Sequence, residues 1–275
     1  MFWIAPAFRA AWPADPRATF EAMLQLEPTG DFHEKQGRST GRYLFPGPDG
    51  PTPVYVKKYR RLPLVQRLFG RLRHFPGPLE LAQMERVAAL GIAVPEPVAA
   101  GADRRHSTCR SFLAIRELTG FVPLHLALPP LLAQASTVEL RAQRKALARR
   151  IAEIARRLHA ANLYHRDLYL CHFFVRFDEQ AADGFELALI DFTRLLRSSR
   201  RRWLVKDLAQ LLFSADLRCL SRTDKLRCAK AYFGLKQLDA PAKRLLREVM
   251  HKAERYRRHN KPVLSSRQST AALPQ

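Results

Sequence analysis

Residues 164–173 read Tyr-His-Arg-Asp-Leu-Tyr-Leu-Cys-His-Phe, and the triplet Ile-Asp-Phe follows at residues 190–192. Apolar runs at 173–175 and 187–190 lie between the two acidic positions, and short apolar runs of this kind are typical of buried strands. A helix is predicted before the first stretch. Its apolar residues fall on one stripe at helical spacing, formed by Leu140, Leu147, Ile151, Ile154 and Leu158. The sequence therefore predicts one acidic loop after a long helix and a second acidic turn after a strand.

The two acidic residues, Asp167 and Asp191, match the needs of phosphoryl transfer. One carboxylate orients or deprotonates the attacking hydroxyl, and the other holds the Mg²⁺ that bridges the nucleotide phosphates. His165-Arg166-Asp167 has the form of a kinase catalytic loop, in which we assign Arg166 a structural role. The alternative interpretations are a capping Asp in a loop and a strand-ending Asp in a turn. We predict a kinase that uses ATP and Mg²⁺.

His172 and Asp207 are candidates for supporting this site. His172 follows Asp167 by five positions, where protein kinases carry a second metal-binding Asn. It is either a metal ligand or a packed, hydrogen-bonded histidine, since imidazole suits Mg²⁺ less well than oxygen does. We expect Asp207 to brace the catalytic loop by accepting its backbone N–H groups. An acidic residue near a helix N-terminus would also be favoured by the macrodipole, and the two interpretations are compatible.

Upstream residues supply candidates for nucleotide binding. Lys57 ends the β-branched stretch 54–57 and would contact the α and β phosphates, held by an ion pair with Glu80. Strand alternation allows only one of Lys57 and Lys58 to point inward, and Glu85 competes with Glu80. Gly37 and Gly41 indicate a loop that closes over the phosphates. A plain turn is the alternative interpretation.

A short arginine-rich segment follows the second acidic turn. Asp207 follows Asp191 by sixteen positions, which leaves no room for the long activation segment on which protein kinases place a peptide. The segment contains Arg194, Arg197, Arg200, Arg201 and Arg202. Arginines beside a kinase site indicate an anionic acceptor, with Arg194 and Arg197 as substrate contacts. A solvated basic loop is the alternative.

The composition is strongly basic: 47 Lys and Arg against 25 Asp and Glu give a formal charge of +22 over 275 residues. Such a charge favours anionic lipid, acidic protein, acidic substrate or nucleic acid, but we find no nucleic-acid-binding motif. There is no apolar run of about 18 residues and no secretory signal, so we expect neither a transmembrane helix nor export. The four cysteines form no CxxC pair, so we expect reduced thiols in the cytosol.

The order of predicted elements gives an α+β fold with a small β-rich lobe followed by a larger helical lobe. Residues 1–27 are expected to form an extension, 28–117 the N-lobe, 118–256 the C-lobe, and 257–275 a basic, disordered tail. Strands are predicted at 54–57, 94–99 and 112–115, a linker at 60–78, and helices at 79–90, 137–158, 205–213, 222–233 and 240–256.

The stretch His165 to Phe173 resembles the bacterial lipopolysaccharide inner-core sugar kinases (Kdo and heptose kinases, the WaaP/InaA type) within the protein-kinase-like superfamily. That family carries an HRD followed by Tyr, an aliphatic residue, Cys-His and Phe. Further likeness lies in the turn at 191–194, in the stretch 202–208 and in the lysine strand at 54–57. In that family Cys-His is the usual form at His172.

The resemblance implies ATP-dependent phosphorylation of a heptose or Kdo hydroxyl in the lipid-anchored lipopolysaccharide core. The enzyme would work peripherally at the cytoplasmic face of the inner membrane, where basic charge suits an anionic acceptor, and an acidic protein is a possible partner. Two alternatives stay open. One is a kinase of another acceptor, either a small molecule or a protein, and the other is a basic scaffold without catalysis.

Overall fold

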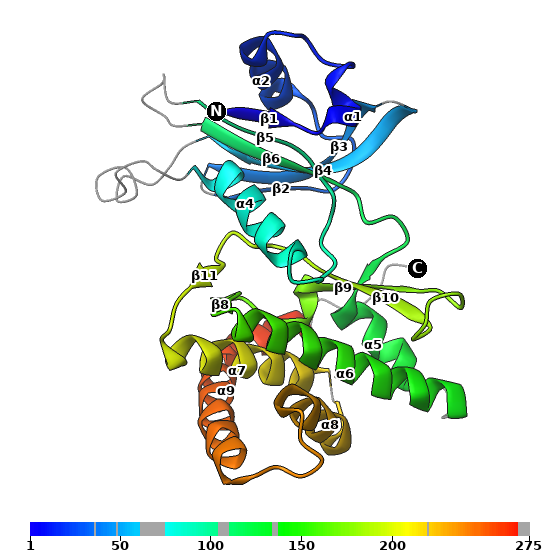
Figure 1. The fold of residues 1–275 in the computed structure, drawn as a ribbon, viewed down its shortest axis with the longest axis vertical. Coiled ribbons are helices and arrows are strands. Elements are labelled where there is room, and N and C mark those ends of the chain that lie inside the picture. The colour runs from blue at the N-terminus through cyan, green and yellow to red at the C-terminus, as the bar shows by residue number, and fades with distance from the viewer. Residues whose placement is uncertain are drawn as a thin grey trace. The chain divides into compact units, whose positions relative to one another are not determined.

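The computed structural model describes residues 1–35, 37–47, 49–60, 75–103, 110–133, 137–218 and 220–268. The chain divides into two compact units. The first comprises Met1–Gly120 with the short segment Asp191–Thr193, and the second comprises Phe121–Ile190 with Arg194–Gln275. The first unit is built on a β-sheet and the second mainly on helices (Figure 1). The division after Gly120 lies close to the boundary predicted after residue 117.

Among the residues that the structure describes, the sheet of the first unit has six strands, and every neighbouring pair is antiparallel. In spatial order these are β1 (Phe2–Ile4), β5 (Pro97–Asp103), β6 (Arg110–Arg116), β4 (Gly50–Tyr59), β3 (Arg38–Gly47) and β2 (Phe32–Lys35). The predicted strand at 54–57 is the central part of β4, whose Val54 and Val56 are fully buried. The strand predicted at 94–99 begins later, at Pro97.

The first 27 residues are part of this unit, which corrects the expectation of a separate extension. Strand β1 pairs with β5 at the sheet edge, and two helices follow it, α1 (Pro6–Arg9) and α2 (Pro16–Gln25). Asp15 caps α2 by accepting from the backbone N–H groups of Arg17 and Ala18. These elements are fixed by burial, because one core cluster contains Phe8, Phe20, Met23, Val56 and Phe112.

Helix α4 (Pro76–Ala88) packs on β5 and β6 of the sheet. Gly77 allows the close approach: a Cβ at this position would lie 2.1 Å from the carbonyl oxygen of Phe112. The helix begins three residues before the predicted start at 79, and it buries Glu80 against the sheet. Of the linker predicted at 60–78, residues 61–74 lie outside the described residues.

The second unit contains five longer helices among its described residues. They are α5 (Leu124–Ala133), α6 (Val138–Ala160), α7 (Arg201–Leu217), α8 (Arg222–Phe233) and α9 (Ala240–Gln268). Short strands accompany them: β7 (Val122–Pro123), β9 (Phe173–Phe177) and β10 (Phe185–Leu189) form one sheet, and β8 (Leu163–Tyr164) pairs with β11 (Leu196–Arg197). The 3₁₀ turn η1 (Leu170–His172) lies between β8 and β9 in the sequence.

The core of the second unit follows the predicted apolar patterns. The stripe on α6 buries Leu147, Ile151 and Leu158, and α6 packs against α8. Helices α7 and α9 share a cluster centred on Phe213 and Val249. Helix α5 was not predicted, and Pro129 and Pro130 lie within it. No helix in the described part of the chain has the length and apolar character to cross a membrane.

The tail predicted to be disordered from residue 257 is helical as far as Gln268 in α9, so this prediction was wrong over that range. Two features extend the helix past its predicted end at 256. Tyr256 packs edge-on against Phe213 of α7. Arg257 forms ion pairs with Asp216 and Glu254, and Lys and Arg are themselves good helix formers. Residues 269–275 lie outside the described residues.

Candidate active site

The first unit holds a buried ion pair between β4 and α4. Lys57 Nζ lies 2.5 Å from Glu80 Oε1, and Glu80 is 2% exposed. Burial disfavours the charge on Lys57, but the carboxylates of Glu80 and Asp191 outweigh that effect and raise the pKa of Lys57. The lysine is therefore held as a cation at a fixed position, which is the state required to bind phosphate.

The sequence left open whether Lys57 or Lys58, and whether Glu80 or Glu85, forms the pair. Strand alternation decides between the lysines, and the side of α4 that packs on the sheet decides between the glutamates. Lys58 points away from Glu80, since its Nζ donates to the backbone carbonyls of Leu24 and Leu26 at 3.1 and 2.7 Å. Glu85 is exposed on α4. The structure thus brings together Lys57 and Glu80, and not Lys58 or Glu85.

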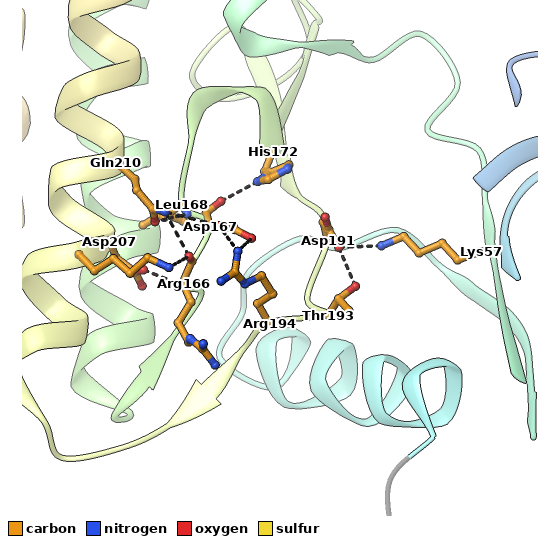
Figure 2. A network of polar contacts seen from close by, with 11 residues as sticks. Lys57, Arg166, Asp167, Leu168, His172, Asp191, Thr193, Arg194, Asp207 and Gln210 are labelled. Carbon is orange, nitrogen blue, oxygen red and sulfur yellow. Dashed lines mark hydrogen bonds and ion pairs between the residues drawn. The ribbon is translucent and has the colours of Figure 1, made fainter. Parts of the chain in front are cut away.

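The segment Asp191–Thr193 joins this cluster. Lys57 Nζ lies 2.8 Å from Asp191 Oδ1, which also lies 2.8 Å from the Thr193 hydroxyl (Figure 2). Glu80 accepts a hydrogen bond from the backbone N–H of Phe192 at 3.2 Å, and its Oε2 lies 2.9 Å from the Thr193 hydroxyl, whose single proton can be donated to Glu80 or to Asp191. Asp191 has a φ of 62°, a left-handed conformation that Asp tolerates better than bulkier residues do. These bonds hold the strained turn in one conformation.

In the second unit, α7 binds the backbone of the loop that carries Asp167. Asp207 is fully buried and accepts from the backbone N–H groups of His165 at 2.7 Å and Arg166 at 2.8 Å. Its carboxylate also lies 3.4 Å from His159 Nε2. Because α7 begins at Arg201, Asp207 lies in the second turn of the helix, and its contacts match the predicted bracing of the loop.

Two further residues on the same face of α7 bind the loop, and neither was predicted from the sequence. Gln210 accepts from the backbone N–H of Leu168 at 3.0 Å, and Ser214 accepts from that of Leu170 at 3.1 Å. Asp207, Gln210 and Ser214 recur at helical spacing along one face of α7, and all three are buried. Buried polar residues at this spacing are the signal that could have identified them.

The Asp167 carboxylate is partly exposed and pairs with Arg194, whose Nη1 lies 3.2 and 3.0 Å from its two oxygens. Its backbone carbonyl oxygen lies 2.6 Å from His172 Nδ1. This contact gives His172 a structural partner, so metal binding by its imidazole stays a prediction. The second predicted arginine, Arg197, is exposed at the end of β11.

Arg166 adopts a φ of 68°, an uncommon conformation for a long side chain. Its guanidinium lies over the ring of Trp203, 4.6 Å from the centroid. Its backbone is held at both ends: the N–H by Asp207, and the carbonyl by Lys206 Nζ at 2.5 Å and Gln210 Nε2 at 3.1 Å. The structural role predicted for Arg166 is consistent with these contacts.

The two predicted glycines lie around the β2–β3 hairpin of the first unit. Gly37 occupies the turn with a φ of 77°, where the absence of a side chain permits the conformation. Gly41 lies within β3, and a Cβ there would come within 3.0 Å of the Phe32 ring. Both positions suit glycine for structural reasons, and phosphate binding by this loop stays a prediction.

Residues 31–232 match the model of the family described as "Lipopolysaccharide kinase (Kdo/WaaP) family". The chain is 33% identical over 252 residues to the lipopolysaccharide core heptose(I) kinase WaaP of Pseudomonas aeruginosa, covering 88% of this chain and 87% of that protein. It is also 27% identical over 226 residues to the Escherichia coli protein of the same name, covering 79% and 80% of the two chains.

Among solved structures, the chain is similar to one titled "WaaP in complex with acyl carrier protein". The TM-score is 0.70 at 28% sequence identity, and the match covers 93% of this chain and 98% of that one. This similarity confirms the predicted α+β, kinase-like fold class.

Proposed function

Because the chain belongs to the lipopolysaccharide kinase (Kdo/WaaP) family, we propose that it transfers the γ-phosphate of ATP to a hydroxyl of the first heptose of the lipopolysaccharide core. Heptose is preferred over Kdo because the curated relatives are named heptose(I) kinases. The observation that carries this proposal is the acidic loop braced by α7, in which Asp167 keeps a partly exposed carboxylate on a rigid backbone.

The buried cluster of the first unit would bind the nucleotide. Lys57 offers a fixed ammonium to the α and β phosphates, and Glu80 keeps that ammonium in place. Asp191 offers a carboxylate, the hard oxygen ligand that Mg²⁺ prefers, and kinase sites complete the coordination with phosphate oxygens and water. When bound, Mg²⁺ neutralises charge on the β and γ phosphates. We expect Gly37 and Gly41 to shape the loop next to the nucleotide.

Asp167 would act on the acceptor. Its carboxylate accepts the proton of the attacking sugar hydroxyl or orients that hydroxyl in line with the transferred phosphorus. Arg194 Nη1 contacts both carboxylate oxygens, so the guanidinium competes with an acceptor hydroxyl for Asp167. A released guanidinium is well suited to bind a phosphate or carboxylate group of the acceptor. Arg197 would supply a second such contact.

The basic character of the chain supports peripheral binding at an anionic surface. A formal charge of +22 attracts both the anionic lipopolysaccharide core and the anionic lipids of the cytoplasmic leaflet. We propose that the protein works from the cytoplasm at the inner membrane. Sedimentation with vesicles should test this: binding should need anionic lipid and should decline with added salt, and binding to neutral vesicles would contradict an electrostatic mode.

An acyl carrier protein is the partner that we propose, since the similar structure contains one. Such a partner fits the expectation of an acidic protein. The second unit also contains an apolar cavity of about 140 Å³, which would accept an acyl chain, and its lining includes Leu147, Ile151, Leu211, Leu212 and Phe233. In gel filtration, acylated carrier protein should co-elute with the chain more strongly than the carrier without its acyl group, and equal co-elution would exclude the cavity from binding.

Identification of the product tests the proposed reaction. Purified protein, ATP and Mg²⁺ are incubated with lipopolysaccharide core that lacks phosphate, and the position of new phosphate is determined by mass spectrometry and phosphorus NMR. Phosphate on the first heptose would support the proposal. Phosphate on Kdo would show that Kdo, and not heptose, is the acceptor sugar. ATP binding without any transfer would favour a non-catalytic scaffold.

A further inference from the structure

Gln210 makes polar contacts on both sides of Asp167. Its Oε1 accepts from the backbone N–H of Leu168 at 3.0 Å, and its Nε2 donates to the carbonyl of Arg166 at 3.1 Å. The same Nε2 lies 3.4 Å from Asp167 Oδ1 (Figure 2). We propose that Gln210 is a positioning residue that fixes the orientation of the Asp167 carboxylate for transfer. This inference rests on the function proposed above for Asp167.

The contacts fix the backbone on either side of Asp167. The peptide group before it is held by two donors, because Lys206 Nζ lies 2.5 Å from the same Arg166 carbonyl. The peptide group after it is held through the Leu168 N–H. With both peptide planes fixed, the direction of the Cα–Cβ bond of Asp167 is fixed as well. The contact with Oδ1 then restricts the side-chain torsions.

The chemistry of the side chain explains why a glutamine serves here. A carboxamide presents one acceptor and one two-proton donor on a rigid plane, so a single group can bind a backbone N–H and a backbone carbonyl together. A glutamate would keep the bond to Leu168 but would place an anion against the Arg166 carbonyl and the Asp167 carboxylate. A methionine would keep the volume and lose every hydrogen bond. Gln210 is 1% exposed, so water cannot replace the lost partners.

Ser214 provides a matched control on the same helix face. It is 8% exposed and accepts from the backbone N–H of Leu170, and its hydroxyl also contacts the backbone carbonyls of Gln210 and Leu211 on its own helix rather than the side chains beside Asp167. Ser214→Ala therefore removes one bond between α7 and the loop without touching the residues beside Asp167. Comparison with the Gln210 variants separates the orientation of Asp167 from the general stability of the loop.

The test measures transfer by the full-length protein with ATP and phosphate-free lipopolysaccharide core, together with stability in urea. Gln210→Met and Gln210→Glu should each lower kcat about 10- to 100-fold, since small misplacements of a reacting group have effects of this size. The KM for ATP should change less than about threefold, because the predicted nucleotide contacts lie elsewhere. The loss of kcat should exceed that of Ser214→Ala by at least about tenfold.

A double-mutant cycle completes the test. In single-turnover assays, Gln210→Met should have no further effect in an Asp167→Asn background if Gln210 acts through Asp167. An equal loss of kcat in both backgrounds, or losses that match those of Ser214→Ala, would overturn the assignment. Wild-type protein without transfer, or Asp167→Asn with full activity, would instead overturn the proposed function and this inference with it.

Discussion

Asp207→Asn is the most informative single perturbation of the second unit. The fully buried Asp207 carboxylate accepts two backbone N–H groups at 2.7 and 2.8 Å. Asparagine has the same shape, but one of its terminal groups is an NH₂ that would face an N–H donor. One charge-assisted bond is lost and the other becomes neutral, and a bond to a charged group contributes about 1.5–3 kcal/mol. We expect the substitution to lower the free energy of unfolding by about 3 kcal/mol.

The assay is urea unfolding followed by far-UV circular dichroism, since most helices lie in this unit. For an m-value of about 2 kcal/mol/M, the midpoint should fall by about 1.5 M with an unchanged slope. The control is Asp239→Asn, because Asp239 accepts from the backbone N–H of Ala242 at the start of α9 and Asn caps a helix as well as Asp does. The reasoning is refuted if Asp207→Asn is as stable as Asp239→Asn.

Three other predictions concern the remaining parts of the structure. Glu80→Gln should weaken the binding of Mg²⁺-ATP about tenfold, measured by calorimetry, because Lys57 loses one of its two carboxylate partners; unchanged affinity would argue against the predicted role of the pair. Gly77→Ala should cost about 2–3 kcal/mol in urea, since its Cβ would meet the backbone of β6 at 2.1 Å, and a neutral effect would mean that α4 can move outward. Burial tends to raise the pKa of Asp224, but hydrogen bonds from Ser221 and Arg144 outweigh burial and lower that pKa. The ionised Asp224 therefore stabilises the fold at pH values above the ordinary carboxyl pKa of 3.8, and this stabilisation is lost as the pH falls through the lowered pKa. The difference in stability between wild type and Asp224→Asn should therefore be constant from about pH 7 to 5 and should shrink below about pH 4, and a difference that persists at low pH would contradict the shift.

The parts of the site that depend on local patterns were predictable from the sequence. Lys57 follows the β-branched residues Val54 and Val56, and Asp167 and Asp191 lie in motifs whose neighbours can be read directly along the chain. The choice of Lys57 over Lys58 needed the structure, because alternation shows that the two point to opposite faces but not which face meets α4. The backbone carbonyls that bind Lys58 come from Leu24 and Leu26, more than thirty positions away.

The support that α7 gives to the loop carrying Asp167 was only partly predictable. Asp207 could be proposed as an acidic residue near the start of a predicted helix, whereas Gln210 and Ser214 were missed. Their spacing on one helix face is visible in the sequence, but the backbone groups they bind lie more than forty positions earlier. The sequence alone does not show which backbone groups a polar residue on an apolar helix face will bind. That becomes visible only when the fold brings the loop against the helix.

Burial by distant segments explains the errors at the two ends of the chain. The first 27 residues show little periodicity, yet β1 completes a sheet edge and Phe8 and Phe20 fill the core of the first unit. At the other end, basic composition indicated disorder, but α9 is stabilised by Tyr256 against Phe213 and by ion pairs along the helix. Both outcomes depend on tertiary contacts, which composition does not report.

The central claim is a division of roles, in which Asp167 acts on the acceptor and Asp191 binds the nucleotide through Mg²⁺. The most direct measurement compares the affinity for Mg²⁺-ATP with the single-turnover rate of transfer to lipopolysaccharide core in Asp167→Ala and Asp191→Ala. We predict that Asp167→Ala keeps the wild-type affinity and loses transfer by at least about 10³-fold, whereas Asp191→Ala loses Mg²⁺-dependent nucleotide binding. Transfer near the wild-type rate by Asp167→Ala would contradict the account.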